Sequence, residues 1–184
     1  TINVPTAVCY LKNTKILSKN FKYCRIEDLK IGDIIMSFGQ FINDETFEFN
    51  SKIKNNKGKN KSKIQAGEVK IKWIGKYKVI NPNFDEYPIC FKKNSINNKE
   101  DIYVSQKHRI IYKPKGELKS KFICAYQVLL DINDRDKCFI DKSLNDIEYY
   151  HLETENHNII KISGIHSETL NNIPNRKNRF SESK

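Results

Sequence analysis

The sequence predicts an all-β fold built from short, mostly antiparallel strands, with one short helix. Apolar side chains recur mainly at every second position or in short runs, as is typical of strands. Closely spaced apolar residues of the kind found in helices are confined to residues 123–130. The 184-residue chain is 38% hydrophobic, which suits one compact core, and its 7 glycines and 5 prolines exclude a Gly- or Pro-rich fibrous chain.

Several short strands are expected in the N-terminal part. They cover residues 14–17, 20–26 and 30–37, with a single turn at residues 27–29. The segment at residues 30–37 is expected to begin with a turn. It contains Gly32 followed by Asp33, and glycine and aspartate both favour turns.

A longer strand is expected over residues 67–79. Val69, Ile71 and Trp73 alternate with lysines, so that one face is apolar and the other charged. This pattern is typical of a half-buried strand.

Two strand pairs are predicted further along the chain. Residues 101–105 pair with residues 109–113 in the first, and residues 148–154 pair with residues 158–163 in the second. The short interruption within each pair contains a histidine.

Two segments are expected to lie outside the core. Residues 51–63 are polar, of low complexity and rich in lysine, so they cannot bury enough apolar area to offset the entropy of ordering. We expect a mobile loop there, with a phosphate-binding arm as the alternative. Residues 171–184 are polar and basic, and we expect a flexible tail.

The charge and the chain ends limit the classes of partner. Lys+Arg is 33 against Asp+Glu 22, a formal net charge of +11, but lysine dominates and reads bases and phosphates less specifically than arginine. We therefore do not expect nucleic-acid binding. No apolar run approaches the roughly 18 residues of a membrane span, so no membrane partner is expected. The start lacks a signal peptide and an initiator Met, which indicates a fragment.

The metal-ligating residue types do not form a metal-site pattern. The five cysteines are odd in number, widely spaced and without a Cys-x-x-Cys pair, which favours free thiols and an intracellular compartment. His151 and His157 are six residues apart, but the turn between them makes a zinc site an unattractive interpretation. We expect no metal and no cofactor.

Three short strings contain residues capable of chemistry. Cys9 lies in Val-Cys-Tyr-Leu near the chain start, and His157 lies in Glu-Asn-His-Asn ahead of Gly164. Ser105 and His108 are three residues apart at a strand end, where a hydroxyl and an imidazole can converge on one point. Taken singly, each string is as well explained by a solvent-exposed turn or an ordinary cysteine.

The order and spacing of these strings resemble the Hint superfamily, the self-processing domains of Hedgehog proteins and inteins. The resemblance runs from Val8 to about Leu170 and is nearest to bacterial intein-like domains outside the classical inteins. It rests on five segments in the family's order: residues 8–16, 25–35, 72–75, 104–110 and 155–164.

The resemblance implies a horseshoe- or disk-shaped Hint domain over residues 9–170, preceded by the remnant of an upstream polypeptide at residues 1–8. It implies an N-to-S acyl shift in which the Cys9 thiol attacks the Val8 carbonyl and forms a thioester. By analogy His108 protonates the departing Cys9 nitrogen and Ser105 hydrogen-bonds the strained amide or the oxyanion. His157 activates the thiol or a later step.

The chain departs from the inteins after Gly164, where no His-Asn pair closes the domain. We therefore expect N-terminal cleavage without full splicing, by a monomer that processes an upstream polypeptide in cis once and does not turn over. Water, a thiol or an amine is the expected acyl acceptor, with Ser167 or Thr169 as the internal alternatives.

Two other functions remain open at this point. One is a degenerate Hint fold kept as a structural domain, in which the Val8–Cys9 bond stays intact. The other is a basic binding module that uses residues 51–63 and does not depend on Cys9.

Overall fold

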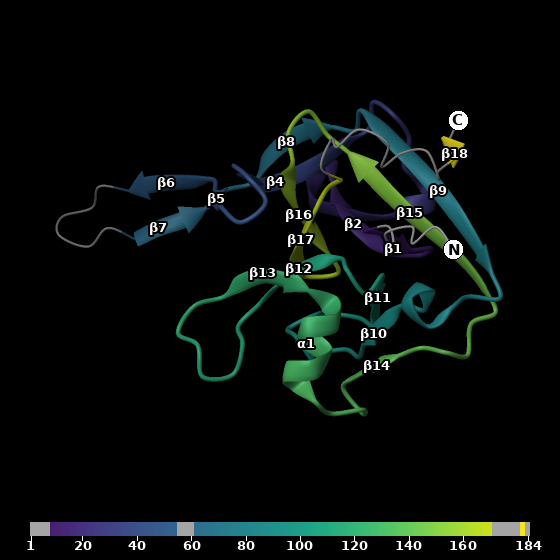
Figure 1. Ribbon diagram of the computed structural model, residues 1–184. Helices are drawn as coiled ribbons and strands as arrows, with labels where there is room; N and C mark the ends of the chain where they lie inside the picture. Colours follow the sequence, from purple (N-terminus) through teal and green to yellow (C-terminus); the bar gives the residue numbers. More distant parts are fainter. Residues whose placement is uncertain (1–7, 55–60, 171–180, 183–184) are drawn as a thin grey trace.

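The computed structural model describes residues 8–54, 61–170 and 181–182, and in this part of the chain it confirms the all-β prediction (Figure 1). Within the described residues there are two large antiparallel sheets, a two-stranded ribbon and a single α-helix. No described helix is long and apolar enough to cross a membrane.

The first large sheet places the start of the domain at its centre. Its described strands, in spatial order, are β14 (Cys138–Ile140), β10 (Ile89–Phe91), β11 (Ile102–Val104), β1 (Tyr10–Leu11), β15 (Asp146–Glu153), β9 (Trp73–Ile80) and β18 (Ser181–Glu182). Because β1 lies between β11 and β15, the residue just before it, Cys9, is held in the interior of the molecule.

The second large sheet gathers strands from both ends of the chain. Its described strands, in spatial order, are β13 (Lys121–Cys124), β12 (Arg109–Tyr112), β17 (Ile165–Glu168), β16 (Asn158–Ile162), β2 (Lys15–Ser18), β4 (Ile34–Phe41) and β5 (Phe47–Phe49). Two further strands attach to it, β3 (Lys22–Arg25) on β2 and β8 (Gly67–Lys70) on β4.

The two predicted strand pairs are wrong as pairs, although their strands exist. β11 belongs to the first sheet and β12 to the second, and β15 and β16 are divided in the same way. Alternating apolar residues show which face of a strand is buried but not which strand it pairs with. The chain therefore crosses from the first sheet to the second at residues 105–108 and again at residues 154–157.

The crossing at residues 105–108 is fixed by the start of the helix. The backbone N–H of Ala125 donates to the His108 carbonyl at 2.8 Å, and that of Tyr126 donates to the Gln106 carbonyl at 2.9 Å. These bonds satisfy amides in the first turn of the helix that have no partner within it.

The single strand predicted over residues 67–79 is also divided. β8 pairs with β4 and β9 pairs with β15, and the chain turns at Ile71, which is 1% exposed. The Ile71 N–H donates to the Asp33 carbonyl at 2.9 Å, and the Lys72 N–H donates to the Glu153 carbonyl at 2.8 Å.

The helix prediction is confirmed in type and shifted by two residues. Helix α1 spans Ala125–Ile132, and the start of the predicted segment belongs to strand β13 instead. The helix ends at Asn133, whose φ of 47° is the left-handed conformation that often closes a helix. The predicted turn near Glu27 is a short 3-10 helix at Ile26–Asp28.

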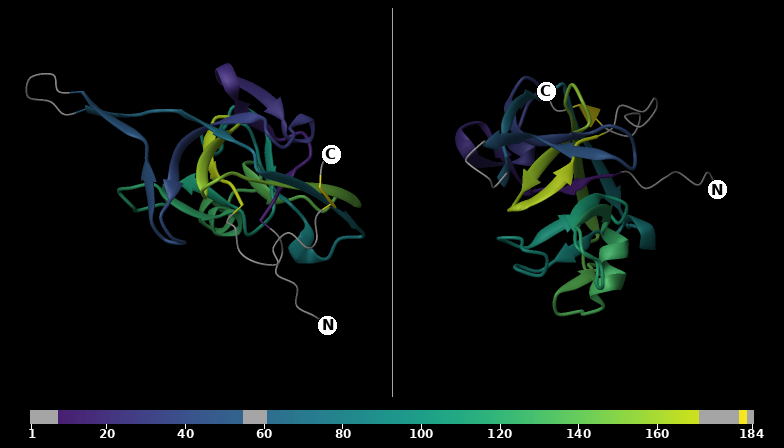
Figure 2. Two further views of the ribbon diagram at one scale, coloured as in Figure 1. Left: turned by 90° about the horizontal axis from the view of Figure 1, so that it is seen from above. Right: turned by 90° about the vertical axis from the view of Figure 1, so that its left-hand side faces the viewer.

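The prediction of a loop over residues 51–63 is wrong at the two ends of that segment. There β6 (Ser51–Lys54) and β7 (Lys61–Ile64) pair as antiparallel strands. In Figures 1 and 2 this ribbon projects from the body beside β4 and β5. Residues 55–60 lie outside the described residues, as does the predicted tail except for Ser181–Glu182, which pairs with β9.

The main core lies between the two sheets. It contains Ile74, Val104 and Leu152 from the first sheet and Ile110 and Ile160 from the second, all fully buried. Burying each such side chain contributes roughly 1.5–3 kcal/mol. The crossing at residues 105–108 carries Ser105 and His108 into the interior, where both side chains are buried.

Candidate functional site

Cys9 and Ser105 are joined through the backbone of Cys9. The Cys9 N–H, which is the nitrogen of the Val8–Cys9 peptide bond, donates to Ser105 Oγ at 2.8 Å. The Ser105 N–H in turn donates to the Cys9 carbonyl at 3.0 Å. Cys9 is fully buried and Ser105 is 4% exposed, so the hydroxyl is fixed on the peptide nitrogen and shielded from water.

His108 lies in the same turn and is also fully buried. Its N–H donates to the Ser105 carbonyl at 3.0 Å, and its ring packs against that of Tyr10 with centroids 4.1 Å apart. Burial lowers the pKa of His108 to about 4, although Glu168 and the Cys9 backbone favour its protonated form. His108 is therefore neutral at pH 7 and able to accept a proton.

Ser167 contacts Nε2 of the His108 ring, and Tyr10 packs against the same ring. Ser167 Oγ lies 2.7 Å from His108 Nε2 and donates to the Arg109 carbonyl at 3.1 Å. The Tyr10 hydroxyl donates to the Glu168 carbonyl at 2.6 Å and lies 2.9 Å from Ser167 Oγ. Both side chains are fully buried.

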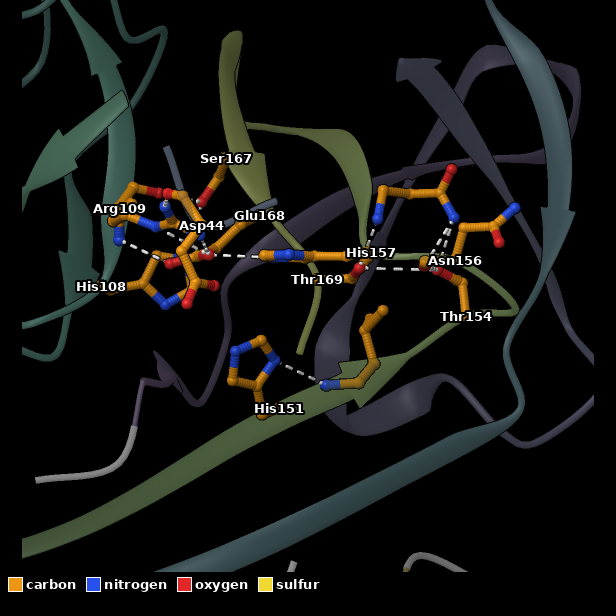
Figure 3. A network of polar contacts seen from close by, with 12 residues as sticks. Asp44, His108, Arg109, His151, Thr154, Asn156, His157, Ser167, Glu168 and Thr169 are labelled. Carbon is orange, nitrogen blue, oxygen red and sulfur yellow. Dashed lines mark hydrogen bonds and ion pairs between the residues drawn. The ribbon is translucent and has the colours of Figure 1, made fainter. Parts of the chain in front are cut away.

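Glu168 forms the buried charged centre of the neighbouring network (Figure 3). Its Oε2 accepts from Arg109 Nη2 at 2.7 Å and from Arg109 Nε at 3.0 Å, and its Oε1 accepts from the Arg109 backbone N–H at 3.1 Å. Burial alone would raise the pKa of Glu168, but hydrogen bonds from His157 and Arg109 hold it well below its usual range. The carboxylate is therefore charged.

The structure places His157 on Glu168 rather than on Cys9. His157 Nε2 lies 3.0 Å from Glu168 Oε2, and its ring stacks on Phe41 with centroids 4.3 Å apart. His157 therefore reaches the Cys9 region only through Glu168 and through its effect on the pKa of His108.

His151 is a further buried histidine that the sequence pattern did not single out as part of this site. Its ring centroid is 5.4 Å from that of His108 and 5.5 Å from that of Tyr10. The Leu152 N–H donates to His151 Nδ1 at 2.9 Å, so Nδ1 is the unprotonated nitrogen of this ring.

The chain after Gly164 is closed into the sheet. Gly164 has a φ of +100°, a conformation that favours glycine, in the turn between β16 and β17. The Thr169 N–H donates to the Asn158 carbonyl at 3.0 Å, and Thr169 Oγ1 accepts from the Asn158 N–H at 2.8 Å. The Leu170 N–H donates to the Leu152 carbonyl at 2.7 Å.

The structure thus brings Cys9, Ser105 and His108 together, as the motifs predicted, and adds Tyr10, Ser167 and the Arg109–Glu168 pair. Arg109 and Glu168 are 59 residues apart, and the signal in the sequence is a charge beside His108 and another in an otherwise buried strand. All five cysteines are free thiols. Within residues 8–54, 61–170 and 181–182, no three His, Cys, Asp or Glu side chains are placed to hold a metal ion.

A family described as Hint domain matches residues 57–174. The chain belongs to the Hint domain family. This Hint domain is similar to the solution structure of a bacterial intein-like domain from Clostridium thermocellum, with 13% identity over 88% of this chain and 98% of that one and a TM-score of 0.54.

It is also similar to the crystal structure of a DnaB intein from Synechocystis sp. PCC 6803, with 12% identity over 89% of this chain and 99% of that one and a TM-score of 0.50. No curated protein matches the sequence. At these identities the two solved structures establish the Hint fold alone, and they agree with the predicted resemblance to bacterial intein-like domains.

Proposed function

We propose that this Hint domain cleaves its own chain at the Val8–Cys9 bond, by an N-to-S acyl shift that produces a thioester. The observation that carries the proposal is the Cys9 N–H bound to Ser105 Oγ at 2.8 Å, on the nitrogen that must leave. A neutral, buried His108 in the same turn supplies a group for moving protons there.

The reaction balances with the groups of this chain alone. His108 takes the proton of the Cys9 thiol, and the resulting thiolate attacks the Val8 carbonyl carbon. His108 then returns the proton to the Cys9 nitrogen, the C–N bond breaks, and a thioester and a free amine remain.

Ser105 is suited to the departure of the nitrogen. Its Oγ already accepts the Cys9 N–H, which fixes the orientation of the Val8–Cys9 amide. As that nitrogen gains a proton and loses its resonance with the carbonyl, a nearby acceptor oxygen stabilises the developing charge. Among the described residues, no hydrogen bond joins Ser105 to the Val8 carbonyl, so stabilisation of the oxyanion, the other predicted role of Ser105, stays a prediction.

The fate of the thioester follows from the C-terminal side. Gly164 is followed by Ile-His-Ser-Glu-Thr-Leu-Asn-Asn, so no His-Asn pair closes the domain, and Asn171 lacks the preceding histidine of the motif that would cyclise and release a downstream segment. Ser167 makes three polar contacts within the core, which it would have to leave in order to accept the acyl group. We therefore assign release of the upstream polypeptide, acting in cis, to water, a thiol or an amine, without ligation of the flanks.

The test is a fusion of a reporter protein upstream of residue 1 and a second protein downstream of residue 184. Intact mass should show loss of the upstream reporter alone, accelerated by dithiothreitol. Cys9→Ala should abolish this loss, whereas the control Cys24→Ala should not change it. His108→Ala should slow it by about 10²–10⁴-fold, the usual contribution of a positioned acid–base group.

Two outcomes would overturn the proposal. Cleavage that persists in Cys9→Ala would indicate ordinary proteolysis. A product that joins the two flanking proteins would indicate complete splicing.

A further inference from the structure

A pocket of about 280 Å³ lies at the end of β12 and the start of β17, beside the turn between β16 and β17. Its apolar lining comes from Ile96, Ile111 and Ile165, and Gly164 of the turn also lines it. Its polar lining consists of Ser95, Asn97, Tyr112, Lys113, Ser120 and His166. None of these residues takes part in the proposed cleavage, so the pocket is separate from the site around Cys9.

Two residues that line this pocket carry a buried polar atom without a hydrogen-bond partner. The atoms are Ser95 Oγ and His166 Nε2, and neither has a partner among the described residues. Most buried polar atoms in folded proteins are paired, because an unpaired one has lost its hydrogen bonds to water without replacement. The two residues come from different segments of the chain, and a molecule bound in the pocket would supply partners for both.

The backbone that carries these two side chains is held firmly on both sides of the pocket. Ser95 lies in a turn closed by Asn98, which is fully buried. The Asn98 side-chain amide donates to three backbone carbonyls, those of Phe91, Lys92 and Glu100. The His166 ring packs against Phe38 and Phe49, with centroids 5.0 and 5.2 Å apart. The pocket is therefore preformed, as small-molecule sites usually are.

The charges around the pocket favour an anion. Among the described residues of the lining, Lys113 is the one charged side chain, and none is an aspartate or a glutamate. Burial, followed by Lys161, lowers the pKa of His166 to about 4, so this ring is neutral at pH 7. A neutral imidazole presents either an N–H or a lone pair at Nε2, and an oxyanion selects the N–H form. The Tyr112 hydroxyl already donates to Asp131 at 2.8 Å, so it is not counted as a donor to the ligand.

We propose that this pocket binds a small monocarboxylate with a short aliphatic chain. One lysine in the lining matches one negative charge, and the ammonium, imidazole and hydroxyl groups of Lys113, His166 and Ser95 are donors for carboxylate oxygens. Ser95 Oγ and His166 Nε2 turn from their buried positions towards the carboxylate when it binds. The isoleucines of the lining pack against the aliphatic chain. This binding does not depend on cleavage at Cys9.

The first experiment titrates the ¹⁵N-labelled Cys9→Ala chain with sodium butyrate at constant ionic strength, followed by ¹H–¹⁵N spectra. We expect saturable shifts centred on the amides of Ser95, Gly164 and His166, with a dissociation constant on the order of 1 mM. Butanol and butylammonium have the same chain length with no charge or a positive charge. Each should bind at least about 10-fold more weakly than butyrate, because neither supplies an anion for the donors.

The second experiment repeats the butyrate titration in variants of the lining. Lys113→Gln, Ser95→Ala and His166→Phe should each weaken binding by about 10-fold, because each removes a donor to a charged group. The phenyl ring of His166→Phe keeps an aromatic side chain at this position of the sheet. Lys70→Gln is the matched control, since it removes the same charge from an exposed lysine of β8 outside the lining. At an ionic strength of about 0.15 M screening confines the effect of a lysine to roughly 8 Å, so this variant should bind butyrate as the parent does.

The outcomes decide the proposal independently of the proposed function. Saturable shifts that weaken in Lys113→Gln and persist in Lys70→Gln would support the pocket. Equal binding of butanol, binding of inorganic phosphate in place of butyrate, or shifts that never saturate would each overturn it. A chain that binds butyrate but never cleaves would refute the proposed function alone, and a chain that cleaves without binding butyrate would refute the carboxylate site alone.

Discussion

At the scale of single residues, burial of neutral histidines links the site to the stability of the protein. Burial lowers the pKa of both His108 and His166 to about 4, with Lys161 adding to the effect on His166. In the unfolded chain each has a pKa of about 6.5. Between these values the unfolded state binds more protons than the folded state, so the free energy of unfolding falls as the pH falls from 6.5 towards 4.

We predict that the melting temperature of the Cys9→Ala chain drops on the order of 5 °C between pH 7 and pH 5. The histidines dominate this window because Glu168, whose pKa is also lowered, loses its contribution only below the unfolded pKa of about 4.5. His166→Gln should reduce the drop. A melting temperature that is constant or rises over this pH range would contradict the assignment of neutral buried histidines.

At the scale of the elements, the Arg109–Glu168 pair ties β12 to β17 beside the site. The side chains are 19% and 5% exposed, and removing one partner of such a pair leaves the other charge buried. Glu168→Gln should therefore lower the free energy of unfolding by about 3 kcal/mol, measured by urea denaturation. The exposed pair Lys78–Asp146 is the comparison, and Asp146→Asn should leave the urea midpoint unchanged. Equal effects of the two variants on the urea midpoint would show that burial of the Arg109–Glu168 pair does not increase its contribution to the free energy of unfolding.

Two glycines in the strands around β4 test the register of the second sheet. A Cβ on Gly39 would lie 2.0 Å from the Glu48 carbonyl oxygen of β5, whereas one on Gly67 of β8 would meet nothing closer than 3.7 Å. Gly39→Ala should lower the free energy of unfolding by about 1–3 kcal/mol, because the strands must separate. Gly67→Ala should change it by less than about 0.5 kcal/mol. Similar urea midpoints for the two variants would show that β4 and β5 do not approach as closely as described.

At the scale of the whole molecule, the sequence motifs predicted which residues meet at the proposed site better than they predicted the strand pairing. The order of the Cys9, Ser105-x-x-His108 and late His157 strings predicted the fold and the meeting of the first three residues. It did not predict that each histidine string is a crossing between sheets, because alternation specifies a buried face and not a partner strand.

The supporting residues were missed for a related reason. Tyr10, Arg109 and Glu168 act through contacts between strands that are distant in sequence, and nothing local distinguishes them from core or surface residues. The sequence predicts Ser167 as an alternative acyl acceptor, but its contact with His108 follows only from the pairing of β12 with β17. The predicted thiol-activating role of His157 is not supported by a contact with Cys9, because the His157 ring is bound by Glu168 and stacked on Phe41.

The central claim is that the Val8–Cys9 amide converts to a thioester within the folded domain, and trapping that thioester tests it most directly. A fusion with an upstream reporter is incubated with hydroxylamine at neutral pH, and the released reporter is examined by mass spectrometry. We predict a reporter fragment that ends in a hydroxamate at Val8, formed in the parent chain and absent in Cys9→Ala. Two results would contradict the account. One is a released fragment that carries only a free carboxylate, with no hydroxamate, at every hydroxylamine concentration tested. The other is a folded chain that releases no reporter.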